Sequence, residues 1–362
     1  MIDFSLLTDG GMGWLDASGP ESHLVLSTRI RLARNLSGHP FSGRNGDAER
    51  ERILGLVTAA AGESGALGQA AMFRLDRMDE ADRRVLHERH LVSRELAGLE
   101  GVARVRYGSA LLIQDRLSAM VNEEDHLRLQ GLHSGFAVAE TYAAVDRLDA
   151  DLGGRLSFAF HSEFGYLTAC PTNVGTGLRA SVLIHLPGLV LTKEVSRVLQ
   201  GLAQVGLTFR GLYGEGSEVV GNFFQLSNQT TLGKSETELL DHLAKVVRQV
   251  VDYEEQARSV LLSSAPTVIE DKVWRAYGLL RHARSLSFDE AMNLLSAVRL
   301  GVGLDLVPGM GLYTLNKLLV HTQPAHLAVA ENLPLSDPAL SIRRAALVRR
   351  VIEEEMGRDK LP

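Results

Sequence analysis

The chain has 362 residues, which is enough for two domains or for one large domain with an appendage. Its 38 basic and 44 acidic side chains give a net charge of −6, which argues against wholesale electrostatic binding of nucleic acid. The single cysteine, Cys170, excludes an internal disulfide and a cysteine-rich zinc site, and it favours a cytoplasmic location.

The N-terminal residues and the apolar runs argue against export and against a membrane span. Acidic residues stand near the start where a signal peptide needs basic ones, and no long apolar core follows them. The longest apolar run, roughly residues 180–191, is interrupted by His185 and Pro187. We therefore expect no partner in the membrane.

The first two thirds of the chain alternate between helical and strand patterns. Apolar spacing predicts helices over 47–61, 81–96, 135–148 and 193–204. Residues 110–113 and 117–121 predict a hairpin, and 126–130 predict a strand with one solvent-exposed face. Further strands are predicted at 156–160, 165–169, 178–185, 207–213 and 222–227. Short strands joined by tight turns indicate an α+β fold with an antiparallel sheet flanked by helices.

The pattern becomes helical near Ser235. Ser235 and Glu238 form a capping box that opens a helix extending to about Leu262. Residues 263–266 are the best linker, and helices are predicted beyond it over 268–283, 287–298, 311–319 and 338–356. We expect a catalytic domain over 1–262 and a helical domain over 263–362 that serves dimerisation, substrate binding or regulation.

Three short motifs match known binding patterns only in part. Gly175, Gly177 and Ala180 fit the G-x-G-x-x-A dinucleotide pattern, but the following residues favour a strand where that motif needs a helix. Residues 233–235 end like a phosphate-binding loop whose first glycine is missing, so a helix cap is the better interpretation. His87 and His90 are three positions apart, whereas a zinc-binding helix needs four.

Two charged segments are candidates for chemistry. Arg29 and Arg31 are two apart, so on a strand both point to one face, where they could hold phosphate oxygens or could simply face solvent. Residues 123–125 are three consecutive carboxylates, and Arg128 follows them on the next predicted strand. They form either a charged turn or a cluster that binds a cation or accepts its proton.

These segments belong to four motifs that occur in order. They are Ser-Thr-Arg-Ile-Arg (27–31), Asn-Glu-Glu-Asp-His (122–126), Cys-Pro-Thr-Asn-Val-Gly-Thr-Gly-Leu-Arg-Ala (170–180) and Arg-Gly-Leu-Tyr-Gly-Glu (210–215). Together they resemble the phosphagen (ATP:guanido) kinase family, whose members phosphorylate guanidinium groups with MgATP. Within that family the chain is most similar to the bacterial protein-arginine kinases, which carry an extra helical domain after the kinase portion.

The resemblance implies an ATP site. Arg29, Arg31, Arg128, Arg179 and Arg210 would surround the phosphates, and His90 would contact the base or ribose unless it is only a helix-surface histidine. The remaining expected ATP contacts are Ser27, Thr28, Ile30, Ala180, Ser181, Val182, Leu183, Gly211, Leu212, Tyr213, Gly214 and Glu215. The glycines at 175 and 177 would let the backbone approach the phosphates. Mg²⁺ would be held through ATP and water, without a dedicated set of protein ligands.

The nucleophile would be a guanidinium, which is a planar cation without a free lone pair. Carboxylates must orient it and accept its proton. Glu124 is the first choice for that base, with Glu215 opposite it, while Glu123 or Asp125 would shape the loop. Cys170 is either a small buried residue or a thiolate that helps to hold the substrate guanidinium.

The C-terminal domain departs from the resemblance at one motif. The bacterial enzymes often carry Arg-Asp-x-x-Arg-Ala, a phosphoarginine pocket that tunes activity. Here Arg344 and Ala345 match its last two residues, whereas Leu340 and Ser341 replace the first two. Leucine cannot hold a phosphoryl group, so this pocket is doubtful. The alternative is that Arg343 and Arg344 are surface charges near the start of a helix.

The leading prediction is therefore an ATP-dependent protein-arginine kinase that acts in protein quality control. The alternatives are a free-guanidino phosphagen kinase and an inactive kinase-like scaffold. The resemblance further implies arginine-bearing protein substrates, an activator protein, a transcriptional repressor in the stress response, a Clp-type ATPase-protease and a homodimer. The intact Glu124, Cys170 and five arginines favour catalysis over a scaffold.

Overall fold

The computed structural model describes residues 11–41, 43–99, 104–211 and 219–358. The chain divides into two compact units. Unit 1 comprises Met1–Trp14, Ser27–Ser181 and Ser227–Ala244, and unit 2 comprises Leu15–Leu26, Val182–Leu226 and Lys245–Pro362. None of the described helices is long and apolar enough to cross a membrane.

The strands of the described residues are β1 (Val25–Arg34), β2 (Ala71–Arg74), β3 (Ala110–Gln114), β4 (Leu117–Val121), β5 (Leu127–Ser134), β6 (Phe160–His161), β7 (Gly165–Tyr166), β8 (Leu178–His185), β9 (Leu207–Arg210) and β10 (Phe223–Asn228). The helices are α1 (Asp47–Gly62), α2 (Glu80–Glu88), α3 (Arg94–Ala97), α4 (Val138–Gly153), α5 (Pro187–Leu191), α6 (Val195–Gln204), α7 (Glu236–Ser264), α8 (Pro266–His282), α9 (Phe288–Gly303), α10 (Leu312–His321), α11 (Pro324–Glu331) and α12 (Ala339–Arg358). Short 3₁₀ turns include Leu75–Arg77 and Pro171–Asn173.

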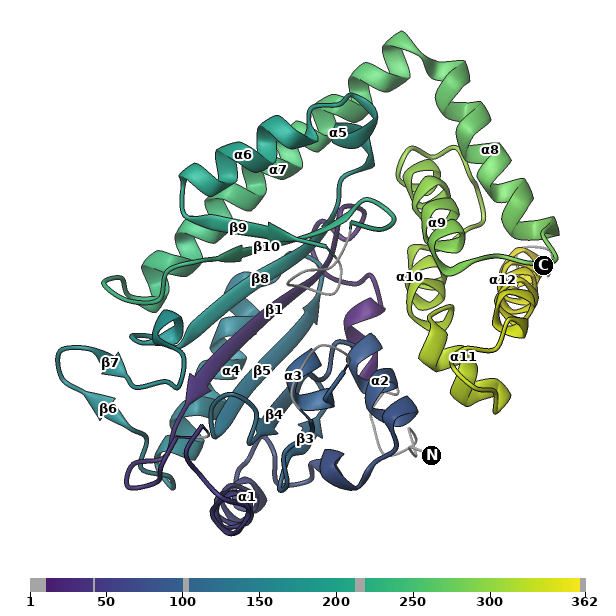
Figure 1. Ribbon diagram of the computed structural model, residues 1–362. Coiled ribbons are helices and arrows are strands. Elements are labelled where there is room, and N and C mark those ends of the chain that lie inside the picture. Colours follow the sequence, from purple (N-terminus) through teal and green to yellow (C-terminus); the bar gives the residue numbers. More distant parts are fainter. Residues whose placement is uncertain (1–10, 42, 100–103, 212–218, 359–362) are drawn as a thin grey trace. The chain divides into compact units, whose positions relative to one another are not determined.

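An eight-stranded sheet has the order β2-β3-β4-β5-β1-β8-β10-β9 (Figure 1). The pairs β2–β3, β3–β4, β4–β5 and β1–β5 are all antiparallel. The register of the last pair places Ala33 opposite Arg128 and Arg31 opposite Gln130. The predicted α+β fold with an antiparallel sheet and flanking helices is confirmed.

Unit 1 packs helices against both faces of its part of the sheet. On one face α4 lies along β5, where a Cβ on Gly131 would meet the side chains of Val145 and Thr141 at 2.5 and 3.2 Å. On the other face α2 and α3 contribute Leu86 and Leu96 to an apolar cluster with β3 and β4. Burial of these apolar faces stabilises the sheet.

The helix predicted over 81–96 is wrong as a single element. α2 ends at Glu88, and His90 has φ of +60°, a left-handed conformation that an α-helix cannot contain. A new helix, α3, starts after Ser93, whose hydroxyl accepts a hydrogen bond from the N–H of Leu96 at 3.1 Å. Helical apolar spacing over this region was therefore produced by two short helices separated by a turn.

The wet face predicted for 126–130 is also wrong. In β5 all residues are buried except the partly exposed Arg128. Gln130 is buried although it is polar, and its Nε2 donates to the carbonyl of His90 at 3.2 Å. A polar residue in an alternating pattern can thus mark a functional or hydrogen-bonded face as well as a solvated one.

The helical region follows the prediction closely. The capping box is confirmed, because Ser235 Oγ accepts from the N–H of Glu238 at 3.3 Å and Glu238 Oε2 accepts from the N–H of Ser235 at 2.8 Å. The predicted linker is reduced to one residue, Ala265, between α7 and α8. The helices α5 and α11 were not predicted, and both begin at a proline.

Candidate functional site

Four arginines gather on one face of the sheet in unit 1. Arg29 and Arg31 alternate along β1 with Thr28 and Ile30, so their side chains share a face. Arg128 lies opposite Ala33 in the β1–β5 register and therefore shares that face too. Burial, followed by repulsion from Arg179 and then Arg128, lowers the pKa of Arg29 to about 10.

The pKa of Arg31 is influenced by more neighbouring charges than that of Arg29. Burial, followed by repulsion from Arg29, Arg128 and Arg179, holds its pKa well below the usual range, with Glu123 acting in the opposite sense. The buried Nε of Arg31 has no hydrogen-bond partner among the described residues. Arg128 is balanced by Glu123 and Glu124, whereas the pKa values of Arg29 and Arg31 are lowered by burial and by the neighbouring cations, so this face provides a site for a multiply charged anion.

The three carboxylates of the acidic loop between β4 and β5 differ in burial and in hydrogen-bond partners. Glu123 has a fully buried side chain whose Oε1 accepts from Arg128 Nη1 at 2.6 Å. Asp125 is buried and its Oδ1 accepts from Asn35 Nδ2 at 2.7 Å and from the N–H of Ala169 at 2.6 Å. Both carboxylates thus hold the loop in place, the role expected for one of them.

Glu124 is the carboxylate of this loop that faces solvent, with 42% of its side chain exposed. Its Oε2 lies 3.3 Å from Arg128 Nη2. Burial raises the pKa of Glu124 above the usual range, the charge of Arg128 lowers it, and those of Asp125, Glu123 and Glu95 raise it further. A half-exposed carboxylate that has a raised pKa and lies beside arginine side chains is suited to accept a proton.

The segment that carries Cys170 is attached to this loop. The bond from Ala169 N–H to Asp125 connects the residue before Cys170 with the residue after Glu124. Cys170 is partly buried, and its Sγ lies 3.0 Å from Thr172 Oγ1. The structure therefore connects the neighbours of Glu124 and Cys170 by a bond from a backbone N–H to a carboxylate, although the two residues are distant in the sequence.

Several expected ATP contacts are buried, and Thr28 and Ile30 lie on the face of β1 opposite Arg29 and Arg31. Thr28 is fully buried on the opposite face of β1, where its hydroxyl donates to the carbonyl of Gly135 at 2.7 Å and accepts from the N–H of Ala137 at 3.0 Å. Ile30 belongs to the core, and Ser27 is buried. The expected contacts in β8 that are buried are Ala180, Ser181, Val182 and Leu183, of which Ser181 Oγ donates to the carbonyl of Arg29 at 3.4 Å.

His90 lies near the arginine cluster but is not on a helix surface. Its ring packs edge-on against Trp14 with centroids 5.2 Å apart. Burial, with the charges of Arg29 and then His87, holds its pKa well below the usual range, so the imidazole is neutral at physiological pH.

The fourth motif is only partly described. Arg210 ends β9 in unit 2, where it is partly exposed and Gly211 is buried. The other expected contacts, Leu212, Tyr213, Gly214 and Glu215, lie outside the described residues.

The glycines at 175 and 177 are required by contacts within the protein. Gly175 has φ of +110°, and a Cβ there would lie 2.3 Å from the carbonyl oxygen of Thr231. Gly177 has φ of +64°, and a Cβ there would lie 2.6 Å from the carbonyl oxygen of Ala33. Their conformations let this segment lie against β1 and the Thr231 backbone, which accounts for both glycines without invoking phosphates. The strand β8 follows them, as predicted, so the dinucleotide interpretation is excluded.

Arg344 is not a surface charge. It is buried, with Nε donating to the carbonyl of Thr322 at 2.6 Å and Nη1 to that of Leu286 at 2.9 Å. Ala345 is also buried, and Leu340 joins an apolar cluster with Leu327. Arg344 connects helices of the C-terminal region, whereas Arg343 is exposed and pairs with Glu331 at 3.4 Å.

Two supporting residues were missed in the sequence. Arg34 is fully buried, forms three hydrogen bonds with Asp149, and lies over the ring of Tyr166 at 3.4 Å. Asn35 donates to Asp125 and accepts from the N–H of His126 at 2.9 Å, so it fixes the acidic loop. Both residues follow the first arginine motif within four positions, and this closeness was the feature of the sequence that could have identified them.

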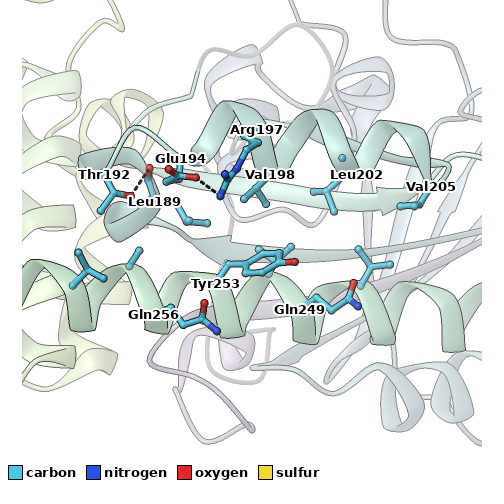
Figure 2. Close-up of a pocket in the computed structure, with 15 residues that line it drawn as sticks. Leu189, Thr192, Glu194, Arg197, Val198, Leu202, Val205, Gln249, Tyr253 and Gln256 are labelled. Carbon is cyan, nitrogen blue, oxygen red and sulfur yellow. Dashed lines mark hydrogen bonds and ion pairs between the residues drawn. The ribbon is translucent and has the colours of Figure 1, made fainter.

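Unit 2 contains a separate cavity of about 750 Å³ between α6 and α7. Figure 2 shows Tyr253 extending between the two helices, with Glu194 and Arg197 paired at one end. Its lining is mainly aliphatic, including Val198, Leu202 and Val260, so its chemistry differs from that of the arginine cluster.

Comparison with sequence families identifies two matches that together span most of the chain. Residues 53–257 match the model described as ATP:guanido phosphotransferase, C-terminal catalytic domain. Residues 266–360 match the protein-arginine kinase McsB C-terminal domain. Proteins named protein-arginine kinase from Symbiobacterium thermophilum and Brevibacillus brevis are 47% and 44% identical to this chain. The alignments cover 93% and 94% of this chain and 95% and 96% of those proteins.

Solved structures are similar as well. The duplicated taurocyamine kinase from Schistosoma mansoni aligns with a TM-score of 0.58 and 26% identity, over 70% of this chain and 35% of that one. A lombricine kinase structure aligns with a TM-score of 0.57 and 23% identity, over 71% of each chain. The second likeness concerns the fold alone.

Proposed function

Since the chain belongs to the ATP:guanido phosphotransferase family and, within it, to the group of the protein-arginine kinases, we propose that it transfers the γ-phosphoryl group of ATP to arginine side chains in proteins. The observation that carries this proposal is the arrangement in unit 1, where a cluster of arginines, in which Arg29 and Arg31 are buried among other cations, lies beside one half-exposed carboxylate. The cluster suits a polyphosphate, and the carboxylate suits a cationic acceptor.

The arginines hold the donor. Arg29, Arg31, Arg128 and Arg179 surround the phosphates of ATP, and the family resemblance implies Arg210 as a further contact. Phosphoryl transfer asks the protein mainly to position its reactants and to stabilise spread negative charge. One arginine in such a site is worth a factor of about 10³–10⁵ in rate. His90 contributes a neutral ring for the base or ribose.

The carboxylate activates the acceptor. Glu124 orients the substrate guanidinium and takes one of its protons, which frees a nitrogen lone pair. That nitrogen forms a bond to the γ-phosphorus as the bond from phosphorus to the β,γ-bridging oxygen breaks, and ADP leaves with that electron pair. Glu215 serves as a second carboxylate, and Cys170 helps to hold the guanidinium.

The donor set fits a magnesium ion that is bound through ATP. Glu123 and Asp125 are buried and accept hydrogen bonds from Arg128, Asn35 and Ala169, so we assign both to holding the loop and not to binding the metal. Bound in this way, Mg²⁺ would supply positive charge to the triphosphate.

The domain division and the cellular context are further proposals. A catalytic domain over 1–262 and a helical domain over 263–362 are supported by the two matched ranges and by the break at Ala265 between α7 and α8. From the family resemblance we propose cytoplasmic stress-response partners, namely an activator protein, a repressor and a Clp-type ATPase-protease, and a homodimer.

The test is incubation with MgATP and an arginine-rich unfolded protein, and in parallel with free arginine, followed by phosphorus NMR. An acid-labile N–P signal on the protein is the expected result. A signal on free arginine alone would assign the chain to phosphagen kinases of small guanidino compounds, and no signal with either acceptor would favour a scaffold.

A further inference from the structure

The loop that carries Glu124 begins at a strained residue. Asn122 has φ of +57°, a left-handed conformation that non-glycine residues adopt only with support. Its Nδ2 donates to the carbonyls of Arg50 and Gly108, both at 2.9 Å, and its N–H donates to His126 at 3.0 Å. These bonds set the direction in which the chain enters residues 123 and 124.

Gly108, one of those partners, is held from both sides. Its carbonyl accepts from Asn122, and its N–H donates to Asp76 Oδ2 at 2.9 Å. Its φ is +74°, and a Cβ there would lie 3.1 Å from the backbone of Arg50. The Gly108 backbone therefore connects Asp76 to Asn122 by two hydrogen bonds, and its packing against Arg50 restricts its movement.

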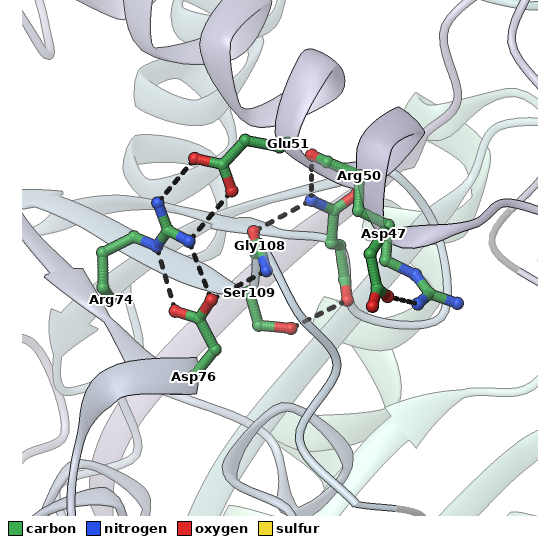
Figure 3. A network of polar contacts seen from close by, with 8 residues as sticks. Asp47, Arg50, Glu51, Arg74, Asp76, Gly108 and Ser109 are labelled. Carbon is green, nitrogen blue, oxygen red and sulfur yellow. Dashed lines mark hydrogen bonds and ion pairs between the residues drawn. The ribbon is translucent and has the colours of Figure 1, made fainter.

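Asp76 is fixed by a charge pair with little access to water. Arg74 donates to both of its oxygens, at 2.9 and 2.7 Å, and reaches Glu51 with two further bonds at 2.8 and 3.0 Å (Figure 3). The exposed fractions of the Arg74 and Asp76 side chains are 14% and 6%. Hydrogen bonding to Asp76 raises the pKa of Arg74, so the pair stays ionised.

We propose that Asp76, held by Arg74, is a positioning residue for Glu124 that acts through Gly108 and Asn122. The inference rests on the proposed function, because it assigns a supporting role to a network that touches neither phosphate-binding arginines nor substrate. It gives a catalytic reason for a charge pair that lies outside the four sequence motifs.

The pKa of Glu124 should change when this network is disrupted, so the pH dependence of the reaction tests the proposal. The charged groups that act on it are Arg128 on β5, Glu123 and Asp125 on its loop, and Glu95 on α3. Burial is the largest cause of its raised pKa. When the loop loosens, Glu124 gains water, its pKa falls toward the ordinary value, and its distance to the substrate is no longer fixed.

The first variant is Asp76→Asn. Asp76 Oδ2 accepts from both Gly108 and Arg74, so an amide must place its NH₂ group against at least one existing donor. We expect kcat for protein phosphorylation to fall about 10- to 100-fold, with KM for ATP unchanged within about twofold. The acid limb of the kcat/KM profile should move to lower pH by about half a unit.

Asn122→Gly and Asp47→Asn complete the design. Glycine retains the positive φ and removes only the side-chain bonds, so it should reproduce both changes, and the double variant with Asp76→Asn should be less than additive. Asp47 belongs to the same cluster and pairs with Arg50 at 2.9 Å, but its side chain is 69% exposed and does not contact Gly108. Asp47→Asn should leave kcat and the pH profile unchanged.

The outcomes separate the inference from the proposed function. Wild-type protein that forms no phosphoarginine would remove the proposed function itself. Active wild type, with an Asp76→Asn variant whose kcat and acid limb match those of Asp47→Asn, would reduce the network to a structural role, even if the unfolding midpoint had dropped. Equal losses of kcat and of ATP affinity would also contradict the inference.

Discussion

Arg29 and Arg31 experience electrostatic repulsion from neighbouring cations in the free protein. Their guanidinium groups lie among other cations, and the pKa of each is lowered by burial and by repulsion. A site of this kind destabilises the protein until an anion enters it, so part of the binding free energy of ATP consists of relief from repulsion.

This argument predicts opposite effects of Arg31→Met on stability and binding. The free energy of unfolding of the free protein should rise by about 1 kcal/mol. This is the low end of the range for replacement of a buried charged group by an apolar one, because Arg31 is partly exposed. ATP affinity should fall at least about tenfold, since a charge-assisted contact is lost. Urea unfolding and calorimetric titration measure the two quantities, and a variant that is less stable and binds ATP normally would contradict the account.

Glu124 predicts the pH dependence of the reaction. A general base must be ionised, so kcat/KM falls as the pH drops through its pKa, and burial places that pKa above the ordinary carboxyl value of about 4.3. Arg128 lowers the pKa of Glu124, so Arg128→Gln should move the acid limb to still higher pH. A wild-type limb at the ordinary carboxyl value would contradict this assignment.

Helices and strands bring the site residues together through buried polar contacts. Arg34 on β1 and Asp149 on α4 form such a contact, with exposed fractions of 2% and 10% for their side chains. Removal of one partner leaves an uncompensated buried charge, whose cost exceeds that of any exposed pair.

Asp149→Ala should therefore lower the free energy of unfolding by about 3–5 kcal/mol. The matched control is Asp271→Ala, which removes an exposed pair with Arg275 on α8 and should change the free energy of unfolding far less. Chemical denaturation of both variants measures the difference. Equal costs would show that the Arg34 contact does not stabilise the connection between β1 and α4.

Local chemistry made some elements predictable and others not. The capping box at Ser235 and the hairpin around Asp115 were predictable because a few adjacent residues determine them. The break at His90 was not, because its positive φ interrupts a region whose apolar spacing remains helical. Likewise the burial of β5 depends on α4 and on the segment around His90, which pack over its two faces and which spacing along one strand cannot reveal.

The same distinction holds for the site. The motifs identified Arg29, Arg31 and Glu124, whose residue types reflect the chemistry directly. Glu124 was the first choice among three adjacent carboxylates because of the family resemblance. The residues alone give no physical reason for that choice, since the partners Arg128, Asn35 and Ala169, which hold Glu123 and Asp125, are known only from the structure. It also missed the supporting charge pair of Arg74 and Asp76, which contacts the site only through backbone groups.

At the scale of the whole molecule, function depends on local charge and not on net charge. The chain carries a net charge of −6, yet four arginines gather on one face of unit 1. A neutral or acidic protein can thus bind a polyphosphate when its sheet aligns cations from strands that are distant in the sequence.

The central claim is that Glu124 takes the proton from an arginine side chain whose nitrogen then attacks ATP held by the arginine cluster. Quantitative phosphorus NMR of wild type and Glu124→Gln, with ATP affinity measured on the same samples, tests it most directly. The account predicts that the variant binds ATP within about twofold of wild type and loses phosphoarginine formation by about 10²–10⁴. Phosphoarginine formed by the variant at the wild-type rate would contradict it.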